Sequence, residues 1–165
     1  MTLDVIHHTS QLWRAEPEKA RGRLAVTAVP EGAAAAFATG AFSWRADLPS
    51  ALGGGDSAPS PTALLLSALA GCAVLFLRDT LAPQLGITLR SVKATASCES
   101  DDRGLLGIGG AAPDLQNLTL KVEIDSPSPQ EKIGALLAVW RQRCPIYLAL
   151  TLPQSVRVSL ALTGA

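Results

Sequence analysis

The longest apolar run in the chain predicts a helix at the centre of the fold. Residues 63–77 contain one clearly polar side chain, that of Ser67, so the helix that they form is apolar on every side, unlike a surface helix. Ser60 as N-cap and Pro61 as first helical residue predict a helix from Pro61 to about Leu81. Because a membrane span needs roughly 20 apolar residues, we expect a buried core helix instead.

Two later segments alternate apolar and polar residues, as strands with one solvent-exposed face do. They are residues 89–98 and residues 117–125. Their apolar sides comprise Val92, Ala94, Ala96 and Cys98 in the first segment and Leu118, Leu120, Val122 and Ile124 in the second. The glycine-rich residues 101–114 between them are too many for a tight turn, and we expect a mobile loop there, lying over a functional site.

The segment before the helix is predicted as strands followed by a loop. Residues 11–46 have the composition of short strands with turns, most clearly residues 22–29 and 33–46, which a turn at residues 30–32 separates. Residues 47–61 are dense in Gly, Pro, Ser and Asp, which is typical of a loop.

A second helix and a last strand are predicted near the C-terminus. Ser128 and Glu131 form the pattern of a capping box at the helix start, and Pro145 ends the helix directly after Cys144. Residues 155–162 alternate and are predicted as a closing strand. The order of strands, helix, strands, helix and strand predicts an α+β fold with helices packed on antiparallel sheet.

Composition narrows the class of protein. The chain has 165 residues, 48% of them hydrophobic, which suits a single domain spanning residues 1–165. Its 14 basic and 14 acidic residues balance, so no nucleic-acid partner is expected. Three widely spaced cysteines do not form a secreted disulfide framework, and residues 1–14 lack the apolar core of a signal peptide. We therefore expect a cytoplasmic protein.

The three cysteines are the candidate reactive residues. Cys72 lies in the apolar run, where a thiol is usually an inert small hydrophobe with a raised pKa, but where it can also be a nucleophile kept away from water. Cys144 lies in the last helical turn beside Arg141 and Arg143, and cations near a thiol lower its pKa. Cys98 ends a strand without an evident partner, and we interpret it as structural or as a bystander.

Other site chemistries fit the sequence poorly. A zinc site would need four ligands from the cysteines, His7 and His8, and no pair of them has the spacing of a zinc knuckle. A Ser-His-Asp hydrolase needs a histidine after His8, and the sequence has none. The stretch LGGGD is not followed by the GK[ST] of a phosphate loop.

Three stretches together resemble the OsmC/Ohr family of thiol-dependent peroxidases. They are LGGGDSAPSPTALLLSALAGC, a Gly/Pro loop that leads into a helix with a cysteine in its middle; RCPIYLAL, a helix that ends at Cys-Pro; and the terminal strand VRVSLAL. The match extends from about Trp13 to Leu162, and its specificity comes from the order and separation of the two cysteine motifs.

This resemblance implies a fold and a reaction. Two chains would interlock as a homodimer, with antiparallel sheets wrapped around two long central helices. Cys72 would be the peroxidatic cysteine, Cys144 the resolving cysteine, and Arg45 the cation that holds the Cys72 thiolate. The substrates would be organic hydroperoxides and the reductant a dithiol of the lipoyl type, with no metal or organic cofactor. The apolar neighbours Leu65, Leu69, Leu75 and Phe76 favour an alkyl hydroperoxide over hydrogen peroxide.

The sequence departs from the family at one position. Family members carry a Glu just after the proline that opens the helix, and it engages the arginine, whereas Thr62 and Ala63 follow Pro61 here. Another acid or backbone carbonyls are therefore expected to hold Arg45, and the candidate acids are Asp47, Asp56 and Asp79. The absent Glu also keeps open an alternative, a non-enzymatic OsmC-like binding or scaffold protein in which both cysteines are core thiols.

Overall fold

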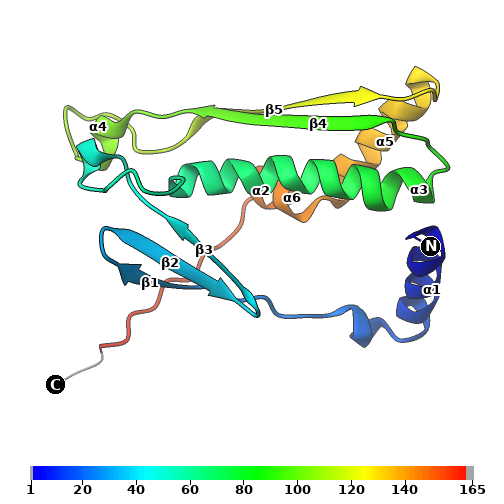
Figure 1. Cartoon of the computed structure of the whole chain (residues 1–165), viewed down its shortest axis with the longest axis horizontal. Helices are drawn as coiled ribbons and strands as arrows, with labels where there is room; N and C mark the ends of the chain where they lie inside the picture. The colour runs from blue at the N-terminus through cyan, green and yellow to red at the C-terminus, as the bar shows by residue number, and fades with distance from the viewer. Residues whose placement is uncertain (1, 163–165) are drawn as a thin grey trace.

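The computed structural model describes residues 2–162 and has a long helix at its centre. Helix α2 (Pro61–Leu75) continues through a π-helical turn, η3 (Phe76–Leu81), into α3 (Ala82–Gln84) (Figure 1). Its predicted start is confirmed, because the Ser60 hydroxyl accepts a hydrogen bond from the Ala63 amide at 3.2 Å.

A two-stranded antiparallel sheet covers one side of this helix (Figure 1). Strand β4 (Ser91–Glu99) pairs with β5 (Gln116–Asp125), and the predicted alternation is confirmed along β4, where every second residue is half-buried. The connection between them is not wholly irregular, because it contains α4 (Asp102–Leu105). A Cβ on Gly104 would lie 2.5 Å from the Ala112 carbonyl oxygen, so the connection folds closely back on itself.

Helices α5 (Gln130–Arg143) and α6 (Pro145–Thr151) complete the core beside the central helix. The buried side chains that meet there are Leu69, Ala73, Leu77, Leu81, Ala82, Ile87, Leu136, Trp140 and Cys144. The predicted cap at Ser128 is wrong: Pro129 occupies the N-cap without a side-chain bond. The Ser128 amide instead donates to the Ser126 hydroxyl at 3.0 Å. Ser128 therefore belongs to a turn that precedes the helix and does not cap it.

The N-terminal prediction of strands from residue 11 is wrong at its beginning. Helix α1 (Thr2–Ala15) and the 3-10 turn η1 (Pro17–Ala20) precede the first strand. Ile6, Thr9, Ser10 and Leu12 are its partly buried residues, so two polar side chains share the side that faces the rest of the chain. The helix packs against α3 and η3.

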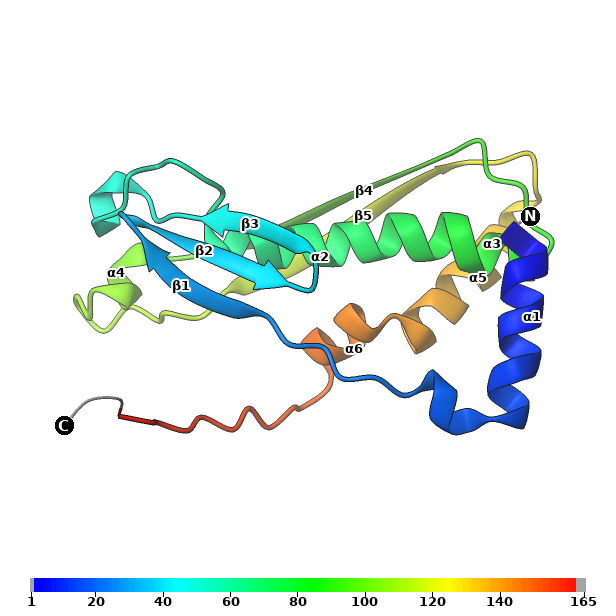
Figure 2. The same cartoon turned by 60° about the horizontal axis from the view of Figure 1, so that its bottom comes forward.

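A three-stranded antiparallel sheet lies on the side of α2 opposite the β4–β5 sheet (Figures 1 and 2). Its strands, in spatial order, are β1 (Thr27–Glu31), β2 (Ala34–Thr39) and β3 (Phe42–Ala46). Residues 33–46, predicted as one strand, are therefore a hairpin that turns at Gly40, whose φ of 54° favours glycine. All of β1 is exposed, so this sheet has little core of its own.

The predicted closing strand, residues 155–162, belongs to no sheet among the described residues. It runs away from the body of the chain as a drawn-out segment (Figure 2). Its apolar residues Val156, Val158, Leu160 and Leu162 are between 84% and 92% exposed. These side chains therefore form an exposed apolar row, which is uncommon on the surface of a monomeric protein.

The central helix is also incompletely covered. Of α2 itself only Leu69 and Ala73 are buried, and Leu75 is 56% exposed. The helical stretch Pro61–Gln84 is long enough and apolar enough to cross a membrane, judged by length and composition alone. Core helices of soluble proteins can have the same length and composition.

Candidate functional site

The sulfurs of Cys72 and Cys144 are in contact, 2.9 Å apart, although 72 residues separate them in the chain. A disulfide bond is about 2.05 Å long, so these are two free thiols that touch. Cys72 comes from the middle of α2 and Cys144 from the junction of α5 and α6. The structure therefore brings together two of the three residues that were predicted for the site.

The Cys-Pro pair explains the position of Cys144. Its amide donates to the Trp140 carbonyl at 2.8 Å and ends α5, while its ψ of 114° turns the chain out of the helix. Pro145 then begins α6, where a missing amide hydrogen costs nothing. The Cys144 sulfur accepts from the Tyr147 amide at 3.5 Å, so this cysteine also caps α6, and it is fully buried.

Burial raises the pKa of the Cys72 thiol to about 11, and the adjoining Cys144 sulfur adds to the rise. The Ile146 amide acts in the opposite direction, because an N–H that points at a sulfur favours the thiolate. The raised pKa means that Cys72 is almost entirely a thiol at pH 7. The surroundings within one chain thus make Cys72 a weak nucleophile.

A groove of about 540 Å³ leads to Cys72. Its other lining residues are Leu75, Phe76, Asp79, Thr80 and Pro145. Two of the expected apolar neighbours, Leu75 and Phe76, therefore lie in it, whereas Leu69 faces the core. Cys72 is half-buried and opens into this groove, so a small molecule can reach its sulfur but not that of Cys144.

The charge nearest the groove is an anion. Asp79 lines it and is held by Arg78, whose Nε and Nη2 donate to the two carboxylate oxygens at 2.6 and 2.7 Å. This pairing lowers the pKa of Asp79, which stays ionised. No Lys or Arg lines the groove within residues 2–162, so the chain by itself offers Cys72 no cation there.

Arg45, the third predicted residue, lies away from the two cysteines. It sits on β3 and lines a different hollow, together with Pro59 and Leu64 at the start of α2. Leu64 precedes Cys72 by eight residues, or about 12 Å along a helix axis. One chain therefore does not bring Arg45 to the cysteine pair.

The three acids expected to hold Arg45 are engaged elsewhere, and the partner of Arg45 is Glu31. Asp79 pairs with Arg78, and the Asp56 carboxylate accepts from the Ser50 amide at 3.1 Å. Glu31 Oε2 lies 2.9 Å from Arg45 Nε. The sequence patterns missed this pair because they treated residues 33–46 as one strand, and only the hairpin places β1 and β3 on either side of β2.

Asp47 organises the loop that joins β3 to α2. Only 4% exposed, it accepts hydrogen bonds from the amides of Leu48, Gly55 and Ser57 and from the Ser57 hydroxyl, and these bonds hold its pKa at about 2. A Cβ on Gly54 would lie 1.9 Å from the Leu48 carbonyl oxygen, so the glycines permit this close folding. Asp47 is therefore an anchor for the loop and not a partner for Arg45.

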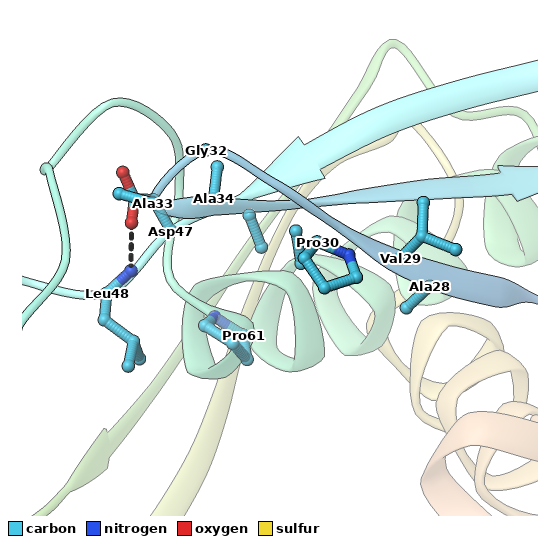
Figure 3. A pocket seen from close by; sticks show the side chains of 11 residues that line it. Ala28, Val29, Pro30, Gly32, Ala33, Ala34, Asp47, Leu48 and Pro61 are labelled. Carbon is cyan, nitrogen blue, oxygen red and sulfur yellow. Dashed lines mark hydrogen bonds between the residues drawn. The ribbon is translucent and has the colours of Figure 1, made fainter. Parts of the chain in front are cut away.

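A hollow of about 430 Å³ lies between β1, β2 and the start of α2 (Figure 3). Alanine, valine and proline side chains line most of it, and its one carboxylate, that of Asp47, is taken up by the loop amides, as the dashed bond to Leu48 illustrates. The hollow contains no nucleophile, so the cysteine groove is the better candidate for chemistry.

Known structures share this fold. A crystal structure of an OsmC-like protein from Mycoplasma pneumoniae matches with a TM-score of 0.67 and 23% identity, over 79% of this chain and 89% of that one. An organic hydroperoxide resistance protein from Legionella pneumophila matches with a TM-score of 0.60 and 22% identity, over 79% and 90%. One from Elizabethkingia anophelis, with thiocyanate bound, matches with a TM-score of 0.61 and 19% identity, over 80% and 90%.

The sequence comparisons agree with the architecture. A search of curated proteins gives no match. The family model described as OsmC-like protein matches residues 53–159. This range includes the end of the loop before α2, the central helix, the β4–β5 sheet and both cysteines of the site. With the long helix, the antiparallel sheets and this match over more than half its length, the chain belongs to the OsmC-like protein family.

Proposed function

We propose that this protein reduces organic hydroperoxides through Cys72 and Cys144. The observation that carries the proposal is the contact of the two sulfurs at 2.9 Å, one open to an apolar groove and the other fully buried. Membership of a family that includes hydroperoxide resistance proteins supports it.

The reaction divides into two steps with distinct roles for the sulfurs. The Cys72 thiolate attacks the distal oxygen of ROOH, the O–O bond breaks, and ROH leaves after taking up a proton, with Cys72 oxidised to a sulfenic acid. The Cys144 sulfur then attacks the Cys72 sulfur and displaces the oxygen as water, which leaves a disulfide. Because the two sulfurs already touch, the second step needs only a small movement.

The difference in burial between the two cysteines supports this division of roles. A hydroperoxide can approach Cys72 from the groove, and the apolar walls Leu75 and Phe76 favour a substrate with an alkyl or aryl part. A dithiol reductant would enter the same way and attack the Cys72 sulfur, with Cys144 as the leaving group. Its second thiol then attacks the mixed disulfide, which returns Cys72 as a thiol and leaves the reductant as a disulfide.

A homodimer would supply what the single chain lacks. The uncovered side of α2 and the exposed segment 155–162 need another chain, and Arg45 lies by Leu64, which is about 12 Å along the helix from the Cys72 of the same chain. In the proposed dimer, Arg45 of one protomer stabilises the Cys72 thiolate of the other. A guanidinium suits this task because it keeps its charge and is weakly hydrated.

The test is hydroperoxide consumption by the wild type and by Cys72→Ser, Cys144→Ser and Cys98→Ser variants. With cumene hydroperoxide and dihydrolipoamide, we expect turnover in the wild type and in Cys98→Ser and no reaction in Cys72→Ser. With the hydroperoxide alone, we expect Cys144→Ser to form one equivalent of sulfenic acid. Equal inactivity of all four proteins, with no sulfenic acid detected by mass spectrometry, would favour the non-enzymatic alternative.

A further inference from the structure

The carboxylate that holds Arg45 comes from the neighbouring β1, not from the helix. Glu31 is the last residue of β1, and its Oε2 lies 2.9 Å from the Nε of Arg45 on β3. We propose that Glu31 is a positioning residue that aims the Arg45 guanidinium at the Cys72 thiolate. The inference rests on the function proposed above, since it concerns the cation of that site.

The strand register explains how the two side chains meet. Glu31 lies opposite Ala34 and Arg45 opposite Ala36, and because residues two apart share a face, all four lie on one side of the sheet. The ion pair crosses over β2, a distance of about 10 Å between the outer strands. The side chains of Ala34 and Ala36 are small, so they leave room for the ion pair to cross over β2.

The three acids that the sequence offered for this arginine are engaged elsewhere. Asp47 accepts hydrogen bonds from the loop amides, Asp56 accepts one from the Ser50 amide, and Asp79 forms an ion pair with Arg78. Thr62, at the second position of α2, has no charge to offer. Glu31 therefore supplies from a strand the carboxylate that the start of the helix lacks.

The pair is positioned to face an incoming group. Glu31, Ala36 and Arg45 line one hollow, together with the end of the loop that joins β3 to α2 and with Leu64 of α2. The side chains are 57% and 51% exposed for Glu31 and Arg45, so both remain open to a second chain. The closest approach of Glu31 is to Nε, and the terminal nitrogens of Arg45 carry further N–H donors that can face a thiolate.

An exposed ion pair contributes little to folding, which makes the proposal testable. Pairs of this kind change stability only slightly, so a Glu31→Gln variant is expected to fold and dimerise as the wild type does. We expect Glu31→Gln to change the orientation of the Arg45 guanidinium and thereby to lower the reactivity of Cys72.

The experiment measures the rate at which iodoacetamide alkylates Cys72 between pH 5 and 10, followed by mass spectrometry of the peptide that contains it. This readout does not require hydroperoxide turnover. Relative to the wild type, Arg45→Ala is expected to slow alkylation near neutral pH by about tenfold, and Glu31→Gln by about threefold to fivefold with the curve moved to higher pH. Glu31→Asp is expected to lie between Glu31→Gln and the wild type.

Two further variants separate orientation from loss of charge. Glu123→Gln removes a carboxylate from an ion pair with Lys121 on the other sheet and is expected to leave the alkylation curve unchanged. Thr62→Glu adds a carboxylate in the first turn of α2, where the helix dipole favours it, and is expected to restore part of the alkylation rate of the Glu31→Gln protein. In the wild-type background the same change is expected to do little.

The outcomes distinguish this inference from the proposed function. An alkylation curve of Glu31→Gln that coincides with the wild type while Arg45→Ala is shifted overturns the role of Glu31 and leaves the peroxidase proposal intact. Shifted curves for both variants in a protein that consumes no hydroperoxide uphold the role of Glu31 and overturn the peroxidase proposal. Unchanged curves for both variants overturn the role of Glu31 together with that of Arg45.

Discussion

The two sides of the central helix differ in how much of their surface one chain buries, and we call them the complete side and the incomplete side. On the side of the β4–β5 sheet and α5, side chains such as Leu77, Leu136 and Cys144 are fully buried within one chain. On the side of the β1–β3 sheet, all of β1 and the segment 155–162 are exposed. The complete side holds the sulfur pair, and the incomplete side holds the cation. In the proposed function, one chain therefore supplies the cysteine pair and a second chain supplies the cation that activates it.

The largest expected effect comes from placing charge on the exposed C-terminal segment. In the proposed dimer, the alternate residues Val158 and Leu160 pack against the second chain, so Val158→Asp with Leu160→Asp should abolish assembly, because a buried unpaired charge is very costly. Light scattering at micromolar concentration measures the change, with Ser159→Asp on the opposite side of the segment as the control. A wild type that is already a monomer would overturn the dimer and the comparison with it.

The next effect concerns reactivity without assembly. Arg45→Ala should leave the dimer intact and slow hydroperoxide consumption at neutral pH, because each unit by which the pKa of Cys72 rises lowers its thiolate fraction up to tenfold. Stopped-flow kinetics with an organic hydroperoxide measures the change, and Arg90→Ala, which removes an exposed ion pair beside β4, is the control. Equal rates for the two variants would show that the cation of Cys72 lies elsewhere.

The sequence predicted the complete side better than the incomplete one. The start of α2, the alternation of β4 and the break at Pro145 depend on local rules for caps, period and proline, and each is confirmed. The hairpin at Gly40 and the partner of Arg45 depend on which strands pair, and the alanine run of β2 gives no periodicity from which to infer the pairing. The contact of the two cysteines followed from the family resemblance and not from any local pattern.

A smaller effect is expected where the two sides join. Asp47 has a pKa of about 2 in the folded chain and 3.8 in a reference peptide, so its hydrogen bonds stabilise the fold above about pH 4 and this contribution is lost as the pH falls towards 2. Asp47→Asn should lower the unfolding temperature at pH 6, and the deficit should shrink at pH 3. Asp114→Asn, on an exposed residue, is the control. A deficit that is constant with pH would show that the carboxylate charge does not hold the loop.

The smallest effect compares two glycines, one in each helix of the sulfur pair. Neither Gly71 in α2 nor Gly134 in α5 has any atom within 4 Å of a Cβ built on it, so within one chain alanine fits at both. Alanine is favoured over glycine inside a helix by about 1 kcal/mol, and Gly134→Ala on the complete side should raise the free energy of unfolding by about that amount. Gly71 shares its face of α2 with Leu75, which is 56% exposed, and in the proposed dimer a methyl group on this face would meet the second chain at close range. Gly71→Ala should therefore fail to stabilise the protein and should weaken dimerisation, as measured by unfolding at several protein concentrations. An equal gain from both substitutions would mean that the side of α2 bearing Gly71 stays open in the assembled protein.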